Sequence, residues 1–245
     1  MTKNTSTYKN YPKPPIVEAM IDIQFQPSQI FSIGILEKLY KEMQKEYPNK
    51  EEIRSKTAEV NILEEKANFI NEQIGLKLSS SDKKYIVQFQ KRGFTFSILD
   101  NYHGWEDLLE RGQELWELFC NKTKPDKVIR LAVRYINKIN IPKSNFKLEE
   151  YFNIYPNVFN KQLSGFFLQV QIPQIKEGGL AIVHQTITKP LQTGYTSILL
   201  DLDLFEFKQM NPDSPEIWKR MNIFRKQKDD LFESCITSKT RELFL

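Results

Sequence analysis

Two segments of this chain alternate apolar and polar residues in a way typical of β-strands that have one buried face. From Ile16 to Gln26, Val17 and every second residue after it are apolar, and most residues between them are polar. A similar alternation runs from Val128 to Ile141, and a proline follows each segment. Successive side chains of a strand point to opposite faces, so the pattern predicts a sheet that is covered on one face. Such half-covered sheets are usually antiparallel.

The rest of the chain divides into further strands and helices. Apolar residues at helical spacing predict helices at 35–43, 105–119 and 215–236, with short helices at 147–153 and after Thr237. Further strands are predicted at 84–90, 94–99, 163–172, 179–188 and 194–207. A turn at Lys91-Arg92-Gly93 joins the first two, and its glycine is expected to take positive φ. Residues 41–66 mix charges and predict a solvated surface, whereas 57–80 predict one or two short strands.

The two halves of the chain, about 12–124 and 126–245, share one order of elements: strand, helix, several hairpin strands and a long helix. Ser97–Leu99 and Ser197–Leu199 repeat the same three residues before the two long helices. We therefore predict an α+β fold made of two similar halves. They form a curved antiparallel sheet with the long helices on one side and a saddle on the other.

Residues 1–11 predict a flexible arm, and 12–245 predict a single domain. The first 15 residues contain no apolar segment of the kind found in secretion signals. No segment approaches the roughly 18 apolar residues that a membrane span needs, so no membrane partner is expected. Cys120 and Cys235 are too few for a disulfide framework. We therefore expect a cytoplasmic protein.

Charges of opposite sign occupy the polar faces of the two leading strands. Glu18 and Asp22 lie on the first, and Arg130, Arg134 and Lys138 lie on the second. If the strands are antiparallel neighbours, Glu18 faces Arg134 while Asp22 faces Arg130, or a two-residue shift matches Glu18 with Lys138 and Asp22 with Arg134. Cross-strand ion pairs of this kind stabilise a sheet. Alternatively, the same basic residues bind phosphate.

No catalytic or nucleotide-binding motif is present in the sequence. The only histidines are His103, at a predicted helix start, and His184, in a predicted strand. Asp201 and Asp203, with Glu206 nearby, form the best acidic cluster for a divalent cation. A solvated strand face explains the same residues more simply. We predict no catalytic residue, no resident metal and no cofactor.

Two further features predict contacts with other proteins. The apolar stripe of the helix at 215–236 suits a partner helix or the core of this chain, and Lys228 interrupts it. The phenylalanine-rich strand at 163–170 suits pairing at the edge of a sheet in a dimer. A protein partner or self-association is therefore expected.

Four segments resemble a sporadically distributed bacterial family of uncharacterised proteins of about this length. They are Tyr11–Ala19, Tyr102–Glu106, Val133–Ile139 and Phe232–Thr237. Because the first begins at Tyr11 and the last ends at Thr237, the resemblance extends over nearly the whole chain. His103-Gly104 departs from the small polar residues expected before the helix. The resemblance implies one full-length module and brings no established activity. Patchy distribution is typical of mobile or defence-associated genes, which implies a role that depends on a partner.

Three functions remain open from the sequence. The leading hypothesis is a non-enzymatic binding or interaction module. The second is nucleic-acid or nucleotide binding through Arg130, Arg134 and Lys138 on the sheet face. The third is a metal-dependent hydrolase that uses Asp201, Asp203 or Glu18.

Overall fold

The protein is described here by a computed structural model. The described residues are 11–61, 66–100, 102–142, 146–158, 163–174 and 178–245. The predicted arm at 1–11 lies outside them except for Tyr11, whose hydroxyl donates a 2.6 Å hydrogen bond to Glu233.

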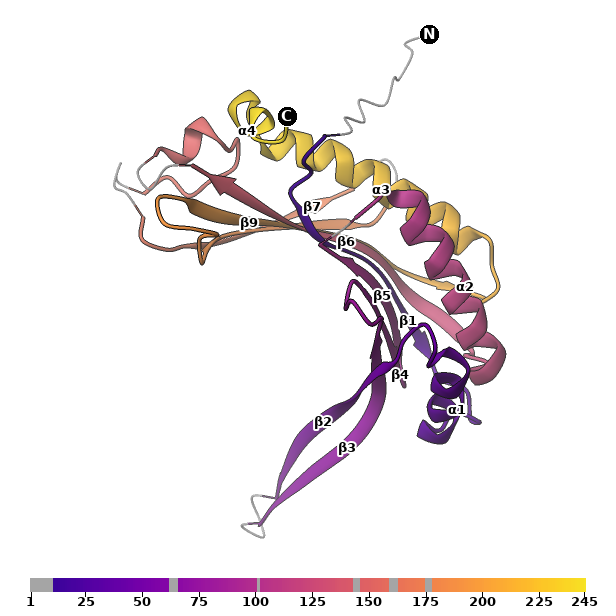
Figure 1. The fold of residues 1–245 in the computed structure, drawn as a ribbon. Helices are drawn as coiled ribbons and strands as arrows, with labels where there is room; N and C mark the ends of the chain where they lie inside the picture. The colour runs from indigo at the N-terminus through magenta and orange to yellow at the C-terminus, as the bar shows by residue number, and fades with distance from the viewer. Residues whose placement is uncertain (1–10, 62–65, 101, 143–145, 159–162, 175–177) are drawn as a thin grey trace.

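A single antiparallel sheet of nine strands forms the centre of the fold (Figure 1). The strands are β1 (Ile16–Gln26), β2 (Asn49–Asn61), β3 (Lys66–Ser79), β4 (Tyr85–Gln90), β5 (Gly93–Leu99), β6 (Lys127–Ile141), β7 (Phe167–Pro173), β8 (Leu180–Thr188) and β9 (Thr196–Met210). Their order across the sheet is β2-β3-β4-β5-β1-β6-β9-β8-β7. The two leading strands, β1 and β6, are therefore neighbours at the middle, which is the arrangement that the predicted charge pairs require.

The helices lie on one face of the sheet, and the other face is the concave side of its curve (Figure 1). They are α1 (Ile33–Met43), α2 (Trp105–Thr123), α3 (Glu216–Cys235) and α4 (Ser238–Glu242), with a 3-10 turn, η1, at Leu148–Glu150. The predicted α+β class and antiparallel sheet are confirmed.

The apolar alternation of the strands builds the core under the helices. Phe25, Phe94, Trp116 and Phe119 are buried and pack ring against ring where α2 crosses β1 and β5. Burial of each such side chain contributes about 2 kcal/mol. Gly112 lets α2 approach the sheet closely, because a Cβ there would meet the Ile21 side chain at 3.0 Å. The core therefore depends on the odd-numbered face of β1, and its even-numbered face is free for other roles.

Strands β2 and β3 form a much longer hairpin than the sequence pattern predicted. The solvated surface expected at 41–66 is confirmed where side chains are described, because most of residues 41–57 are exposed. The strands expected at 57–80 are present but not short, because β2 and β3 have 13 and 14 residues. Only Gly75–Ser79 of β3 pairs with β4, so the outer part projects as a two-stranded ribbon (Figure 1). A ribbon without a covering layer needs no alternation of apolar residues, which explains why the pattern did not show its length.

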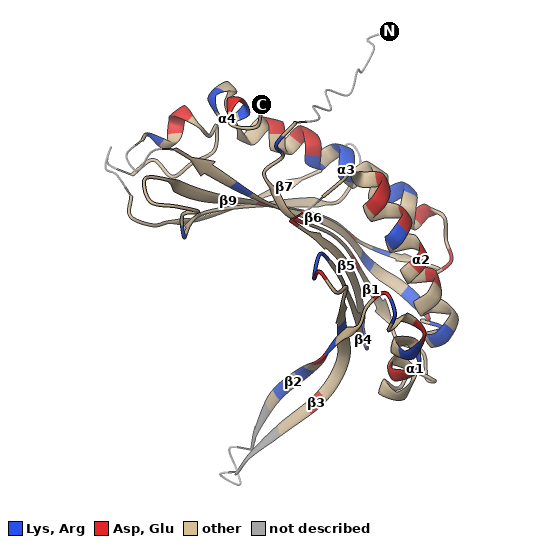
Figure 2. Ribbon diagram, viewed as in Figure 1, with Lys and Arg blue, Asp and Glu red and all other residues tan. Residues whose placement is uncertain are grey.

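Charges of both signs are interspersed along α2 and α3, where blue and red segments follow one another (Figure 2). Among the described helices, none combines the length and the hydropathy that a membrane crossing requires.

Candidate functional site

The register between β1 and β6 places the predicted charged residues on the concave face. Glu18 lies opposite Ile136, and Asp22 lies opposite Ala132. Glu18 therefore shares its face with Arg134, as predicted, but lies diagonal to it. The sequence proposed Arg134 or Lys138 opposite Glu18, and the observed residue, Ile136, lies midway between them. Both proposed registers are therefore wrong by two residues, in opposite directions.

Arg130 is the centre of the first ion-pair group on this face. Its guanidinium donates to Asp22 on β1 at 2.7 Å and to Asp203 on β9 at 3.3 Å. Its carbon also lies 4.5 Å from the ring centroid of Phe205. Asp22 accepts a second hydrogen bond, of 2.9 Å, from Thr95 on β5. Four neighbouring strands thus contribute to one polar group, and the Asp22–Arg130 pair expected from the sequence is present.

Arg134 is the centre of the second group, and its carboxylate partner comes from β9. It donates two hydrogen bonds to Asp201, of 2.8 and 2.6 Å. His184 Nδ1 lies 3.4 Å from the same carboxylate, and its Nε2 lies 3.0 Å from the Gln169 amide oxygen. The pKa of Arg134 is raised, chiefly by the Asp201 hydrogen bond and to a lesser extent by the nearby charge of Glu18. Arg134 is thus held by a bidentate partner that the sequence did not assign to it.

Burial sets the proton affinity of two carboxylates in this cluster. The pKa of Asp22 is raised by desolvation, which outweighs the opposing effect of Arg130 and of the Thr95 hydrogen bond. The pKa of Asp203 is raised by the same cause, against the opposing charges of Arg130 and Arg134. Both carboxylates therefore depend on the guanidinium groups for their charged form. We call the seven residues just described the concave-face cluster: Asp22, Thr95, Arg130, Arg134, His184, Asp201 and Asp203.

Two of the predicted site residues stay outside these ion pairs. Glu18 and Lys138 make no side-chain hydrogen bond or ion pair with any residue that the structure describes. Lys138 lies opposite Leu199 of β9 at the end of the strand. The predicted basic face is thus only partly basic, since its two arginines are already matched by aspartates.

The acidic cluster expected around Asp201 is divided between the two faces of the sheet. Glu206 lies on the helix side, where it accepts hydrogen bonds of 2.7 and 3.0 Å from Arg220 of α3. Asp201 and Asp203 are not a solvated pair, because both are largely buried and bound to arginine. Within the described part of the chain, no group of three or more metal-ligating side chains is close enough to hold an ion.

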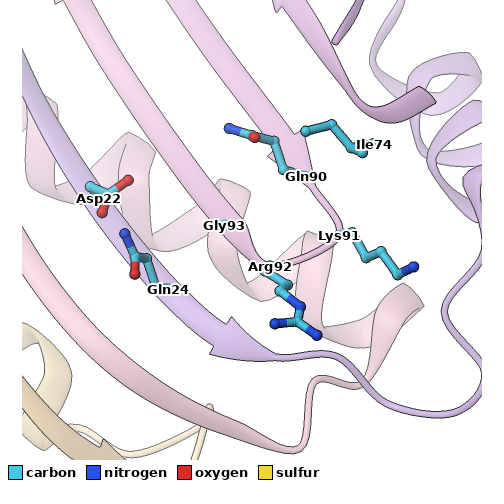
Figure 3. A pocket seen from close by; sticks show the side chains of 7 residues that line it. All are labelled: Asp22, Gln24, Ile74, Gln90, Lys91, Arg92 and Gly93. Carbon is cyan, nitrogen blue, oxygen red and sulfur yellow. The ribbon is translucent and has the colours of Figure 1, made fainter. Parts of the chain in front are cut away.

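A hollow of about 450 Å³ opens on the concave face next to Asp22. Its lining residues are Asp22, Gln24, Ile74, Gln90, Lys91, Arg92 and Gly93. Figure 3 shows Gln24 of β1 and Gln90 of β4 on either side of Gly93, with Arg92 at the turn between β4 and β5. Gly93 lies opposite Gln24 in the sheet, and a Cβ built on Gly93 meets no atom within 4 Å. The missing side chain therefore leaves room for a ligand.

The sequence indicated this turn but gave its glycine the wrong role. Gly93 is not among the residues with positive φ, so the expectation of a left-handed turn residue is wrong. The feature of the sequence that could have indicated the hollow is a glycine, which has no side chain, on the polar face of a strand. Arg92 is exposed and makes no ion pair with any described residue, and Lys91 lies 3.8 Å from Glu72. At the rim of the hollow, Arg92 thus presents a guanidinium that no described carboxylate neutralises.

Comparison with known proteins gives no assignment: no family model matches the chain, and no curated protein matches it. The arrangement of the concave face is therefore the basis for any functional proposal.

Proposed function

We propose that this protein is a non-enzymatic binding module that recognises a partner protein with the concave face of its sheet. The observation that carries the proposal is the hollow at Gly93 beside a cluster whose two arginines are already paired with aspartates. The ion pairs of the cluster hold β1, β6 and β9 together, and the hollow offers space, amide groups and the guanidinium of Arg92, which has no ion-pair partner among the described residues. Resemblance to a sporadically distributed bacterial family, in which a role would depend on a partner, agrees with this proposal.

Charge balance favours a protein over a polyanion as the ligand. On β1, β6 and β9, the concave-face side chains of Arg130, Arg134 and Lys138 stand against four carboxylates. The carboxylates are Glu18, Asp22, Asp201 and Asp203. A nucleic-acid phosphate would have to displace aspartates from both arginines, and these three strands have no excess of positive charge on this face to attract it. This surface is better suited to a partner with mixed polar groups.

The lining of the hollow indicates what the partner would present there. The amides of Gln24 and Gln90 each offer a donor and an acceptor, which suit a peptide group. Arg92 offers a fork that suits a carboxylate. Ile74 supplies an apolar wall. We expect a segment of the partner with an acidic side chain to enter the hollow.

A pair of glycine substitutions tests this proposal. Gly93→Leu fills the hollow, and Gly165→Leu adds the same side chain where a Cβ also meets no atom within 4 Å. The tagged wild type and both variants are purified from the native host, and copurifying proteins are identified by mass spectrometry. We expect one stoichiometric partner with the wild type and Gly165→Leu, and its loss with Gly93→Leu.

Three other outcomes count against the proposal. Equal capture of the partner by all three proteins places the binding surface elsewhere. No partner with the wild type removes the constitutive interaction. Nucleic acid that copurifies without protein, and that is lost in high salt or with Arg134→Ala, favours the second hypothesis. Arg92→Glu adds a further check, because reversal of the rim charge repels an acidic segment.

We also infer that the sheet arose by duplication of one half. In the sheet order, β1, β5, β4 and β3 follow one another outward from the middle, as β6, β9, β8 and β7 do on the other side. Helices α2 and α3 follow β5 and β9 in the chain. The first half adds β2 and a full helix, α1, where the second half has η1. Superposition of the Cα atoms of β1, β5, β4 and α2 on those of β6, β9, β8 and α3 tests this: one rotation about an axis between β1 and β6 must align all four.

A further inference from the structure

Strand β7 is an edge of the sheet that carries no charge. It pairs with β8 on one side, and on its other side it forms no ladder with any strand that the structure describes. Its sequence, FLQVQIP, contains no charged residue. At the opposite edge, β2 has six charged residues in its sequence NKEEIRSKTAEVN. Charged side chains protect an edge strand from pairing with another chain, so β2 has this protection and β7 lacks it.

The side chains of β7 are exposed in a way that a partner strand would change. Phe167 is 68% exposed, although it is a large apolar residue. Leu168, Val170 and Ile172 lie on the helix side and are only half-buried, whereas their neighbours Ala181 and Val183 on β8 are fully buried. One more strand beside β7 would cover this apolar row, which favours addition of a strand.

The order of residues along β7 is complementary to itself. If two copies of β7 run antiparallel with Val170 opposite Val170, then Leu168 faces Ile172 and Gln169 faces Gln171 of the second copy. Apolar side chains meet on the helix side, and amides meet on the concave side, so every cross-strand pair joins residues of like polarity. An interface of this kind, with the same patch on both subunits, is the commonest in homodimers.

We propose that two copies of this chain associate through β7, with Val170 on the two-fold axis, to form one continuous sheet. The axis is perpendicular to the sheet, so both concave faces lie on the same side of the dimer. This inference goes beyond the proposed function and does not rest on it, because β7 and the hollow lie in opposite halves of the sheet.

Charge substitutions at the two glutamines test both the interface and its register. Both positions are exposed, so charges there are compatible with the folded chain. In Q169K/Q171K, lysines oppose each other across the interface. In Q169E/Q171K, each glutamate faces a lysine of the second copy. Sedimentation velocity over a micromolar concentration series gives the dimer dissociation constant for each protein.

We expect the wild type to dimerise, Q169K/Q171K to raise the dissociation constant about tenfold, and Q169E/Q171K to lower it. Leu191→Lys is the control, since Leu191 is 68% exposed in the turn before β9 and should leave the constant unchanged. A wild type that is monomeric throughout overturns the proposal. So does a dimer that neither double variant affects, or one that both weaken equally, because the register requires opposite effects. Gly93→Leu leaves the dimer intact, so failure of the hollow proposal is seen separately.

Discussion

A charged cluster lies against each face of strand β6, and the two clusters differ in what surrounds them. On the concave side, Arg134 remains 39% exposed and can be reached by a partner. On the helix side, Lys228 of α3 lies 4.0 Å from the ring centroid of Tyr135 and contacts Asp229, which Arg225 also contacts at 3.2 Å. We call these four residues the α3 cluster. Exposure distinguishes a surface that can recognise a ligand from one that only supports the fold.

The largest effect is expected in the α3 cluster. Asp229→Asn removes the carboxylate between Lys228 and Arg225, whose side chains are only 9% and 16% exposed. The buried Lys228 then loses its counterion and Arg225 loses one of its contacts, which should lower the free energy of unfolding by about 3 kcal/mol. Urea denaturation followed by circular dichroism measures the loss.

The matched control for that change is the next residue along the helix. Asp230→Asn removes an exposed carboxylate from α3 and should change the free energy of unfolding by less than about 0.5 kcal/mol. Equal losses in the two variants would show that burial of the α3 cluster has no energetic consequence.

The next largest effect is expected where the concave-face cluster is most buried. Arg130→Gln leaves Asp22 and Asp203 without their shared guanidinium, and we expect a loss of about 2 kcal/mol at neutral pH. Burial already raises the pKa of both carboxyl groups, and loss of the cation raises it further. As the pH falls, these carboxyl groups therefore take up protons in the folded variant before they do so in the unfolded chain. The stability that Arg130→Gln loses relative to the wild type should then shrink as the pH falls.

Urea denaturation at neutral pH and in mild acid checks this sign. Lys127→Gln, at the exposed start of the same strand, is the control and should have no measurable effect at either pH. A deficit of Arg130→Gln that grows on acidification would mean that the aspartates draw their stability from elsewhere.

Strand patterns predicted which residues share a face, but they did not predict which residues pair. Alternation is local, so the concave positions of Asp22 and Arg130 follow from a few neighbouring residues. The partner of Arg134 is Asp201, 67 positions away, and its choice depends on the register between β6 and β9. Lys228 was visible as an interruption of the apolar stripe of the last long helix, but its contact with Tyr135 depends on how α3 lies over the sheet.

The hollow was not predictable for a related reason. Gly93 has the same sequence context as an ordinary turn glycine, and only its place opposite Gln24 shows that it leaves a space. The long ribbon of β2 and β3 was missed because neither strand is covered along its outer part, so no buried face imposes a pattern.

A smaller effect is expected at the exposed end of the concave-face cluster. Arg134→Gln should lower the free energy of unfolding by less than about 1 kcal/mol, because solvent screens its ion pair and Asp201 keeps His184 beside it. Urea denaturation alongside Arg130→Gln provides the comparison. If the two variants lose equally, exposure does not separate the two arginines, and both serve mainly to hold the sheet.

The smallest effect is a slope with pH. Burial lowers the pKa of Lys228, and Asp229 offsets this only in part, while Arg225 adds to it. Between the lowered pKa and the ordinary value, the unfolded chain holds a proton that the folded chain has lost. Stability from this group therefore rises with pH through that window. The two thiols act in the opposite direction, since desolvation raises the pKa of Cys120 and Cys235 to about 12.

The Lys228→Met variant isolates the contribution of Lys228 to the pH dependence of stability from that of the thiols. The variant keeps the thiols and the tyrosines, so their contribution cancels in the difference between it and the wild type. That difference should move in favour of the wild type as the pH rises from 8 to about 10, the ordinary lysine pKa. Urea denaturation at four pH values measures it. A difference that stays constant over this range, or that moves in favour of Lys228→Met, would show that burial does not lower the pKa of Lys228.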